Sequence, residues 1–277
     1  MKWAEKLHGL LSVGGETCLI CGRDSRYRAA SFLPVRNAGP RKALRTLCAS
    51  CLARIPWILS ISCPVCGRPE RCGDCLRRWE RHFVCCRGAV RYDDAMKEWL
   101  AVYKYRGLEK LEPILAAMLS TAVEMLLNPL QDGVDVITSV PLAEGRLEER
   151  GFNQAERLSR RVAQWYGLPY EPMLRRARHT EKQSFKSRKD RLEDMKGTFA
   201  LLEERNVPYA MAGTVPTSVP FSASAYPRPL PGASARPLRI LLVDDIYTTG
   251  STMNECASVL RRGYPGCEIY GALWARS

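Results

Sequence analysis

Hydrophobic residues recur from residue 87 onward in two ways, as short continuous runs and as stripes of helical period. The runs predict buried strands, and they lie in GAVRYDD (88–94), VDVITSV (134–140), ILLV (240–243) and CEIYGALWA (267–275). The stripes predict helices that pack one face on those strands, and they cover 96–103, 115–126, 155–165 and 253–260. The first of these helices follows a cap at Asp93 or Asp94. Strands that alternate with helices predict an α/β fold with a mainly parallel sheet flanked by helices.

The stretch after the apolar run at 240–243 carries the most specific chemistry. Two adjacent carboxylates, Asp244 and Asp245, come first, and a helix begins a few residues later. A helix N-terminus binds anions through free backbone N–H groups, whereas paired carboxylates can accept hydrogen bonds from the hydroxyl pair of a ribose. We therefore predict that the carboxylates contact a ribose and that the following loop wraps a 5′-phosphate with Thr248, Thr249, Gly250, Ser251 and Thr252. The alternative is an ordinary strand-turn-helix with an acidic turn.

A second polar turn, PLAEGRLEERGFNQA (141–155), follows the strand predicted at 134–140. Ligands of open α/β sheets bind at the carboxyl edge of the strands, where such a turn lies. Positive charge gathers nearby, at Lys104 in a glycine-punctuated turn and over the segment 175–191. The basic segment is either a solvated loop or a mobile flap that closes over an anionic substrate.

Cysteine pairs dominate the first hundred residues. Two thiolates three residues apart on a tight turn can both reach one Zn²⁺, and two such pairs complete a tetrahedral shell. The chain has four C-x-x-C pairs, which together predict two zinc sites: Cys18/Cys21, Cys48/Cys51, Cys63/Cys66 and Cys72/Cys75. Sequential pairing is the simplest arrangement, and interleaved pairing stays open. Disulfides would need an oxidising compartment, and a redox C-x-x-C would stand alone beside a βαβ unit.

Charge and composition narrow the class of partner. The formal net charge is +13, which favours phosphate-rich ligands or nucleic acid. Arginines and aromatic rings alternate in the cysteine-rich region, as a single-stranded nucleic-acid surface requires. The alternative is that the rings form a small core beside the metal sites and that the arginines only keep the region soluble. No apolar run approaches the roughly 18 residues of a membrane helix, and no signal-peptide pattern opens the chain, so we predict a cytoplasmic protein without membrane insertion.

The composition also predicts where the domains lie. The cysteine-rich module covers 16–82, and the α/β domain covers 87–205 and 238–277. Between its two parts, 206–237 is rich in proline and serine and predicts a disordered or polyproline insert.

The motifs together resemble those of the ComF family of bacterial proteins. The resemblance rests on the four C-x-x-C pairs, KYRG at 104–107, VPLAEGRLEERGFNQA at 140–155, RHTEKQ at 178–183 and VDDIYTTGST at 243–252. The last motif is similar to the loop with which type I phosphoribosyltransferases bind phosphoribosyl pyrophosphate (PRPP). The resemblance implies a double zinc-ribbon module joined to a type I phosphoribosyltransferase fold, and a role in DNA uptake during natural transformation.

The resemblance also implies roles for particular residues. Asp244 and Asp245 would contact the ribose, and Thr248 to Thr252 the 5′-phosphate. The remaining ligand contacts would come from a pyrophosphate turn (Val140, Pro141, Leu142), from the pocket wall (Arg150, Asn153, Gln154) and from a flap (Arg176, Thr180, Gln183). Mg²⁺ would bind together with PRPP.

Three functions follow from these expectations. The first is a PRPP-binding protein that handles single-stranded DNA in competence, with other competence proteins as further partners. The second is an active phosphoribosyltransferase acting on a base or amine, for which the sequence identifies no acceptor and no catalytic residue. The third is a regulator in which PRPP gates nucleic-acid binding.

Overall fold

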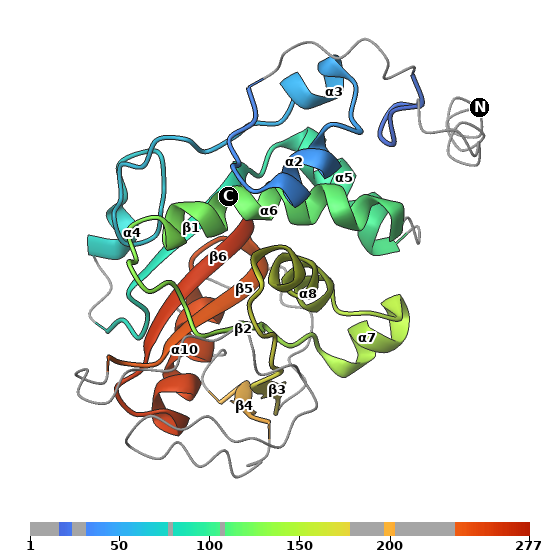
Figure 1. Cartoon of the computed structure of the whole chain (residues 1–277). Coiled ribbons are helices and arrows are strands. Elements are labelled where there is room, and N and C mark those ends of the chain that lie inside the picture. The colour runs from blue at the N-terminus through green and yellow to red at the C-terminus, as the bar shows by residue number, and fades with distance from the viewer. Residues whose placement is uncertain (1–16, 24–31, 77–79, 106–108, 178–196, 203–235) are drawn as a thin grey trace.

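The computed structural model describes residues 17–23, 32–76, 80–105, 109–177, 197–202 and 236–277 (Figure 1). The flap residues Thr180 and Gln183 lie outside the described residues, and so does the proline-rich segment 206–237 except for its last two positions.

Four parallel strands form the central sheet. Their order across the sheet is β1 (Cys85–Arg91), β6 (Glu268–Arg276), β5 (Arg239–Tyr247) and β2 (Val136–Ser139). Each neighbouring pair is parallel, with Val243 of β5 opposite both Ala272 and Ser139. The predicted fold class, a mainly parallel sheet flanked by helices, is confirmed.

Helices cover both faces of this sheet (Figure 1). Leu241 and Val243 point into a core shared with α6 (Glu112–Leu127) and α8 (Gln154–Tyr166). Ile240 and Leu242 point to the opposite face, which α10 (Ser251–Gly263) covers. Because side chains alternate along a strand, both faces of β5 must be apolar, and this explains its continuous run of hydrophobic residues.

Helix α6 is the central packing element. Twelve of its 16 residues are buried, which accounts for its nearly uniform apolar sequence. One of the buried residues is Glu124, whose carboxylate accepts hydrogen bonds from the backbone N–H groups of Arg36 and Asn37 and from the Tyr166 hydroxyl at 2.8–3.0 Å. Asn37 caps α2 (Ala38–Leu44), so these bonds join the cysteine-rich region to the α/β core.

The cap residues explain where the helices begin and end. Asp93, rather than Asp94, accepts a hydrogen bond from the Met96 N–H group and starts α5 (Asp94–Tyr105). Asn153 caps α8, which ends at Gly167 in the left-handed region, at φ 64°.

Several segments differ from the sequence-based expectations, among them Lys104, which was expected in a turn and lies in the last turn of α5. The turn expected over 141–155 contains a helix, α7 (Glu144–Arg150), which ends at Gly151. The carboxylates expected in a loop lie in the last part of β5, because β6 continues beside them and Asp244 pairs with Leu273.

The remaining described elements are short. The strands β3 (Leu174–Arg176) and β4 (Phe199–Leu201) form an antiparallel pair that the sequence did not predict. Helices α3 (Ala49–Ala53) and α4 (Gly73–Leu76) lie beside the cysteine pairs, and a 3₁₀ turn, η1 (Glu109–Leu111), precedes α6. No helix in the described part of the chain has both the length and the apolar character needed to cross a membrane.

Candidate functional site

The two carboxylates at the end of β5 lie where the sheet becomes narrower. Strand β2 ends at Ser139, whereas β5 continues to Tyr247, so Asp244 and Asp245 extend beyond the last residue of β2. Asp244 Oδ1 accepts a hydrogen bond from the Asp245 backbone N–H group at 2.8 Å, and Asp245 forms an ion pair with Lys104 of α5. The carboxylates are thus held at the carboxyl edge of the sheet, as the parallel topology requires.

Burial changes the protonation of the first carboxylate. Asp244 keeps some exposed surface, but protein atoms enclose its carboxyl group. Burial first, and then the negative charge of Asp245, raise the pKa of Asp244 well above its usual value, and Lys104 opposes this shift. The ionised form of Asp244 is therefore disfavoured, and a ligand that brings hydroxyl groups or a cation to this site would favour it.

The loop after β5 leads directly into α10. Gly250 is the N-cap of this helix, with φ 76°, and it offers no side chain to cap the first N–H groups. A Cβ atom at Gly250 would lie 2.0 Å from the Tyr247 hydroxyl oxygen, so the position requires glycine. Thr249 and Ser251 exchange a hydrogen bond between their hydroxyl oxygens at 2.8 Å. The helix start is therefore a compact turn with N–H groups that can receive an anion.

The opposite wall of the site comes from the segment after β2. Asn153 performs two tasks there: its Oδ1 caps α8 by accepting from the Ala155 N–H group at 3.0 Å, and its Nδ2 donates to the Val140 carbonyl at 3.0 Å. The second bond fixes the path of Val140, Pro141 and Leu142. The sequence predicted Asn153 as a ligand contact, which stays a prediction, and in the structure its side chain also bonds to this turn.

Three cationic side chains lie at the carboxylates, in the pocket lining or behind its wall. Lys104 is only 13% exposed in its ion pair with Asp245. Arg150 donates to Gln154 Oε1 at 2.9 Å and to the Tyr105 hydroxyl at 2.8 Å. Arg176 of β3 packs against the Phe199 ring of β4, and burial lowers its pKa. These cations could balance the charge of a polyphosphate.

These segments enclose a pocket of about 260 Å³. It gathers nine of the predicted site residues in one place: Val140, Pro141, Leu142, Asn153, Gln154, Arg176, Asp244, Asp245 and Thr252. The other predicted loop residues, from Thr248 to Ser251, lie between β5 and Thr252 and do not line the pocket. Arg150 does not line it either, but it donates a hydrogen bond to Gln154, which does.

The sequence did not identify three residues of the pocket lining, which are Ala155, Phe199 and Ile246. Phe199 lies in β4, which belongs to the strand pair β3–β4 that the sequence did not predict. The glycine and aromatic residue at 197 and 199 were the only signal for it.

The first cysteine cluster could hold a metal ion. The thiols of Cys18, Cys21, Cys48 and Cys51 lie within 4.8 Å of one another, and Cys21 Sγ lies 3.6 Å from Cys48 Sγ. Four sulfurs at about 2.3 Å from a tetrahedral Zn²⁺ would be separated by about 3.8 Å, so the arrangement fits this ion. A hydrogen bond between the two thiols lowers the pKa of Cys18 to about 4 and raises that of Cys51.

The second cluster has the same composition and is attached to the sheet. It joins Cys63, Cys66, Cys72 and Cys75 within the same 4.8 Å limit, with Cys66 Sγ and Cys72 Sγ 3.6 Å apart. The two clusters correspond to sequential pairing of the C-x-x-C motifs. The remaining cysteines are free thiols, of which Cys86, Cys256 and Cys267 are buried.

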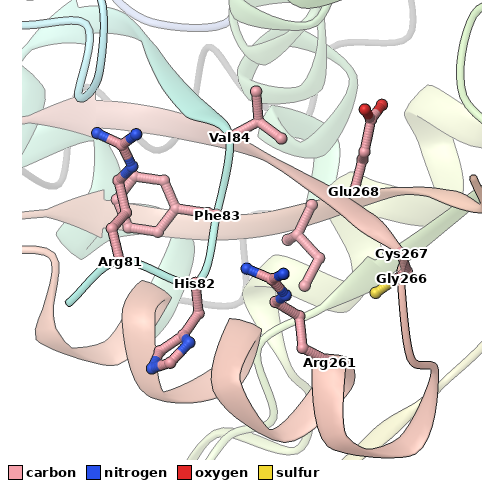
Figure 2. A pocket seen from close by; sticks show the side chains of 9 residues that line it. Arg81, His82, Phe83, Val84, Arg261, Gly266, Cys267 and Glu268 are labelled. Carbon is pink, nitrogen blue, oxygen red and sulfur yellow. The ribbon is translucent and has the colours of Figure 1, made fainter.

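A second hollow, of about 340 Å³, lies at the other end of the sheet (Figure 2). Figure 2 shows that residues 81–84, the end of α10 and the start of β6 surround it. Its only lining carboxylate, Glu268, already accepts from Arg239 and from the Tyr270 hydroxyl. It lacks the paired carboxylates and the helix N-terminus of the first pocket, which is the better candidate site.

Fold and site together define a class of protein. The chain is an α/β protein with an acidic pocket at the carboxyl edge of a parallel sheet and with two four-cysteine clusters suited to a structural metal such as zinc.

Curated relatives resemble the chain over most of its length. "Competence protein F" of Haemophilus influenzae is 27% identical over 240 residues, which cover 81% of this chain and 89% of the relative. "Competence protein ComFC" of Bacillus subtilis is 29% identical over 257 residues, 88% of each chain. "DNA utilization protein YhgH" of Salmonella typhimurium is 27% identical over 228 residues, which cover 78% and 84%. These relatives confirm the resemblance to the ComF family that the motifs indicate.

Two further comparisons add little. No family model matches the sequence. Among solved structures, the adenine phosphoribosyltransferase of Thermoanaerobacter pseudethanolicus shares 15% identity and covers 60% of this chain and 84% of its own, with a TM-score of 0.26. A TM-score this low carries no argument about function.

Proposed function

We propose that the chain binds PRPP together with Mg²⁺ in the pocket at the carboxyl edge of β5. One observation carries the proposal: Asp244 and Asp245 line the same pocket as Thr252, which lies in the first turn of α10. A ribose 5-phosphate needs both features at once, acceptors for its hydroxyls and N–H donors for its phosphate.

Charge favours PRPP over a simple nucleoside monophosphate. Lys104 pairs with Asp245, Arg176 lines the pocket, and Arg150 bonds to Gln154 of the pocket wall. A pyrophosphate would bring negative charge that these cations can balance. Mg²⁺ is commonly held by one or two carboxylates together with substrate phosphates, which matches the few protein oxygens in this pocket. Its volume of about 260 Å³ is near the lower limit of roughly 300 Å³ for small-molecule sites.

The ligand specificity can be tested by thermal unfolding. PRPP with Mg²⁺ should raise the Tm, and above its Kd the rise should grow with the logarithm of ligand concentration, as expected when a ligand binds only the folded state. Ribose 5-phosphate and inorganic pyrophosphate should each raise it less, because each satisfies only part of the pocket. An equal shift for all three ligands would contradict the assignment to PRPP.

We further propose that the protein handles single-stranded DNA in natural competence. The support is the net charge of +13, the exposed cations of the cysteine-rich region and the exposed ring of Phe32, which is 73% accessible. The names of the relatives, which refer to competence and to DNA utilization, point in the same direction. We also propose the domain limits 16–82 for the zinc-ribbon module and 87–205 with 238–277 for the phosphoribosyltransferase-like domain.

The DNA proposal predicts binding that weakens steeply with salt. Replacing Arg45 and Arg54, both exposed, by alanine should weaken binding of a fluorescent single-stranded oligonucleotide by several-fold and reduce the salt slope. Arg160 and Arg262, exposed on α8 and α10, provide a charge-matched control pair. Equal losses in both double variants would place the DNA surface elsewhere.

An active phosphoribosyltransferase is the alternative function. The observation that favours it is the completeness of the loop, which retains both carboxylates together with Thr248 and Thr249. It predicts acceptor-dependent release of pyrophosphate from PRPP, lost in Asp245→Ala. A PRPP-gated regulator would instead show a change in DNA affinity on addition of PRPP, with no release of pyrophosphate.

A further inference from the structure

Arg276 is buried beside the second cysteine cluster, at the end of β6. Arg276 is only 4% exposed, and its Nη2 donates a hydrogen bond to Cys66 Sγ at 3.3 Å. Its Nε and Nη1 are also buried, and neither meets a hydrogen-bond acceptor among the residues that the structure describes. A buried guanidinium without a carboxylate partner is unfavourable, so another negative charge must compensate it.

A metal-loaded cluster supplies that charge. Four thiolates around one Zn²⁺ carry a net charge of about −2, and Cys66 would be one of the four. A hydrogen bond from a neighbouring donor to a metal-bound ligand orients the ligand and stabilises the shell. Arg276 and the loaded cluster therefore fit each other as counter-ions, and each is less favourable without the other.

The Arg276 side chain also contacts Tyr247, which in turn contacts the proposed phosphate loop. Its guanidinium carbon lies 4.2 Å from the centroid of the Tyr247 ring, and Tyr247 is itself buried. The Tyr247 hydroxyl in turn packs against Gly250, the N-cap of α10. The Ser277 N–H group also bonds to the Tyr247 carbonyl at 3.1 Å, which holds the two strand ends together.

The cluster itself is fixed rigidly to the same sheet. The Cys86 N–H group of β1 donates to the Val65 carbonyl at 2.7 Å, within the knuckle that carries Cys63 and Cys66. A Cβ atom at Gly67, the next residue, would lie 2.6 Å from the Cys86 carbonyl oxygen. A displacement of the knuckle is therefore transmitted to the strands rather than absorbed by a loose contact.

We propose that Arg276 is a positioning residue that couples metal occupancy of the second cysteine cluster to the Gly250 loop, so that the two sites change each other's affinity. The proposal rests on the proposed binding of PRPP. Such coupling is reciprocal for equilibrium binding: PRPP should raise the metal affinity of the cluster by the same factor by which the metal raises the affinity for PRPP, typically five- to 150-fold, about 30-fold at the centre of that range.

The test measures zinc release from the full-length protein to a chromophoric chelator, with and without PRPP and Mg²⁺. In the wild type, PRPP should slow one of the two release phases by up to about 30-fold, the full factor applying if the rate of metal association is unchanged. In Arg276→Met that phase should be faster and insensitive to PRPP. Tyr247→Leu should retain zinc nearly as well as the wild type yet lose the sensitivity to PRPP, because it keeps the Arg276–Cys66 contact and breaks the path to Gly250.

Two further variants keep the outcome decisive. Arg239→Met removes another partly buried arginine of the sheet, one that pairs with Glu268 and contacts no cluster cysteine, and it should leave both release phases unchanged. Arg276→Lys serves if the methionine variant does not fold, and it should weaken the coupling because an ammonium cannot both stack on the ring and donate to the sulfur in the same geometry. Cadmium NMR of the cadmium-loaded protein should assign the affected phase to the Cys66 cluster.

The results separate this proposal from the one on which it rests. If PRPP does not bind the wild type, the proposed function fails first. If PRPP binds the wild type and Arg276→Met equally well, and zinc leaves both at the same rate, the coupling is refuted while PRPP binding stands.

Discussion

At the scale of single residues, the pocket disfavours the ionised form of Asp244. The raised pKa of Asp244, caused by burial and by Asp245, means that the folded protein binds this proton more tightly than the unfolded chain does. Between the ordinary aspartate pKa, about 3.9, and the raised value, the unfolded chain has lost the proton and the folded protein has kept it. Stability therefore falls as the pH rises through this window.

This sign leads to a prediction for Asp244→Asn. The variant should be more stable than the wild type at neutral pH, and the difference should disappear below about pH 4, where both states of the wild type are protonated. Urea unfolding over this pH range gives the comparison. A stability difference that is independent of pH would rule out an electrostatic origin.

Asn153 joins helix capping to the shape of the pocket. Asn153→Ala should lose about 1 kcal/mol of stability through the cap and weaken PRPP binding because the Val140 carbonyl loses its donor. Asn37→Ala, which removes the cap of α2 far from the pocket, should cost similar stability and leave PRPP affinity intact. Asn153→Asp can keep the cap but cannot donate to Val140. Wild-type affinity in Asn153→Asp would contradict the positioning role.

At the scale of elements, the start of α10 depends on the turn at Gly250. Gly250→Ala must accommodate a positive φ, which costs roughly 1 kcal/mol, and also a collision with the Tyr247 hydroxyl. Gly266, just beyond the other end of α10, has φ 82° and open space around it. Gly266→Ala should therefore lose only the stability that the positive φ costs. Thermal unfolding and PRPP titration should show the larger loss of stability and the only loss of affinity in Gly250→Ala. Equal effects would show that the contact with Tyr247 is unimportant.

The same elements show how far the sequence alone reaches. The strands and the long helices could be predicted because their apolar runs and stripes are local signals, and the sequential C-x-x-C pairs form the two clusters seen in the structure. The helix α7 was missed because its residues are polar and none is buried, so no apolar stripe marks it. The β3–β4 pair was missed because three-residue strands are held by tertiary contacts.

The residues of the candidate site likewise fall into those that the sequence alone could predict and those that only the fold brings together. Asp244, Asp245 and the small residues after them are contiguous and could be predicted from one motif. The ion pair of Lys104 with Asp245 and the contact of Arg276 with Cys66 join residues far apart in the chain, so only the fold brings them together.

At the scale of the whole molecule, the two metal clusters should act as parts of the folded core. Three cysteines of each cluster belong to the hydrophobic clusters that also contain residues of the sheet. We therefore expect about two zinc ions per chain and a large fall in Tm on chelation, because binding of a structural metal contributes folding free energy. Cys66→Ser should lose about one zinc ion, whereas Cys85→Ser, at a half-buried thiol outside both clusters, should keep both. Full zinc content in Cys66→Ser would refute the second site.

The central claim is that the two carboxylates of β5 hold PRPP. Calorimetric titration of PRPP and Mg²⁺ into the wild type and into Asp244→Ala/Asp245→Ala tests it most directly, with Glu148→Ala/Glu149→Ala of α7 as an exposed control of equal charge change. We predict saturable binding to the wild type and to the control, and at least a hundredfold weaker binding to the Asp244→Ala/Asp245→Ala variant, as two lost charge-assisted contacts of about 1.5–3 kcal/mol each imply. Equal binding of PRPP by the Asp244→Ala/Asp245→Ala variant and the wild type would contradict the claim.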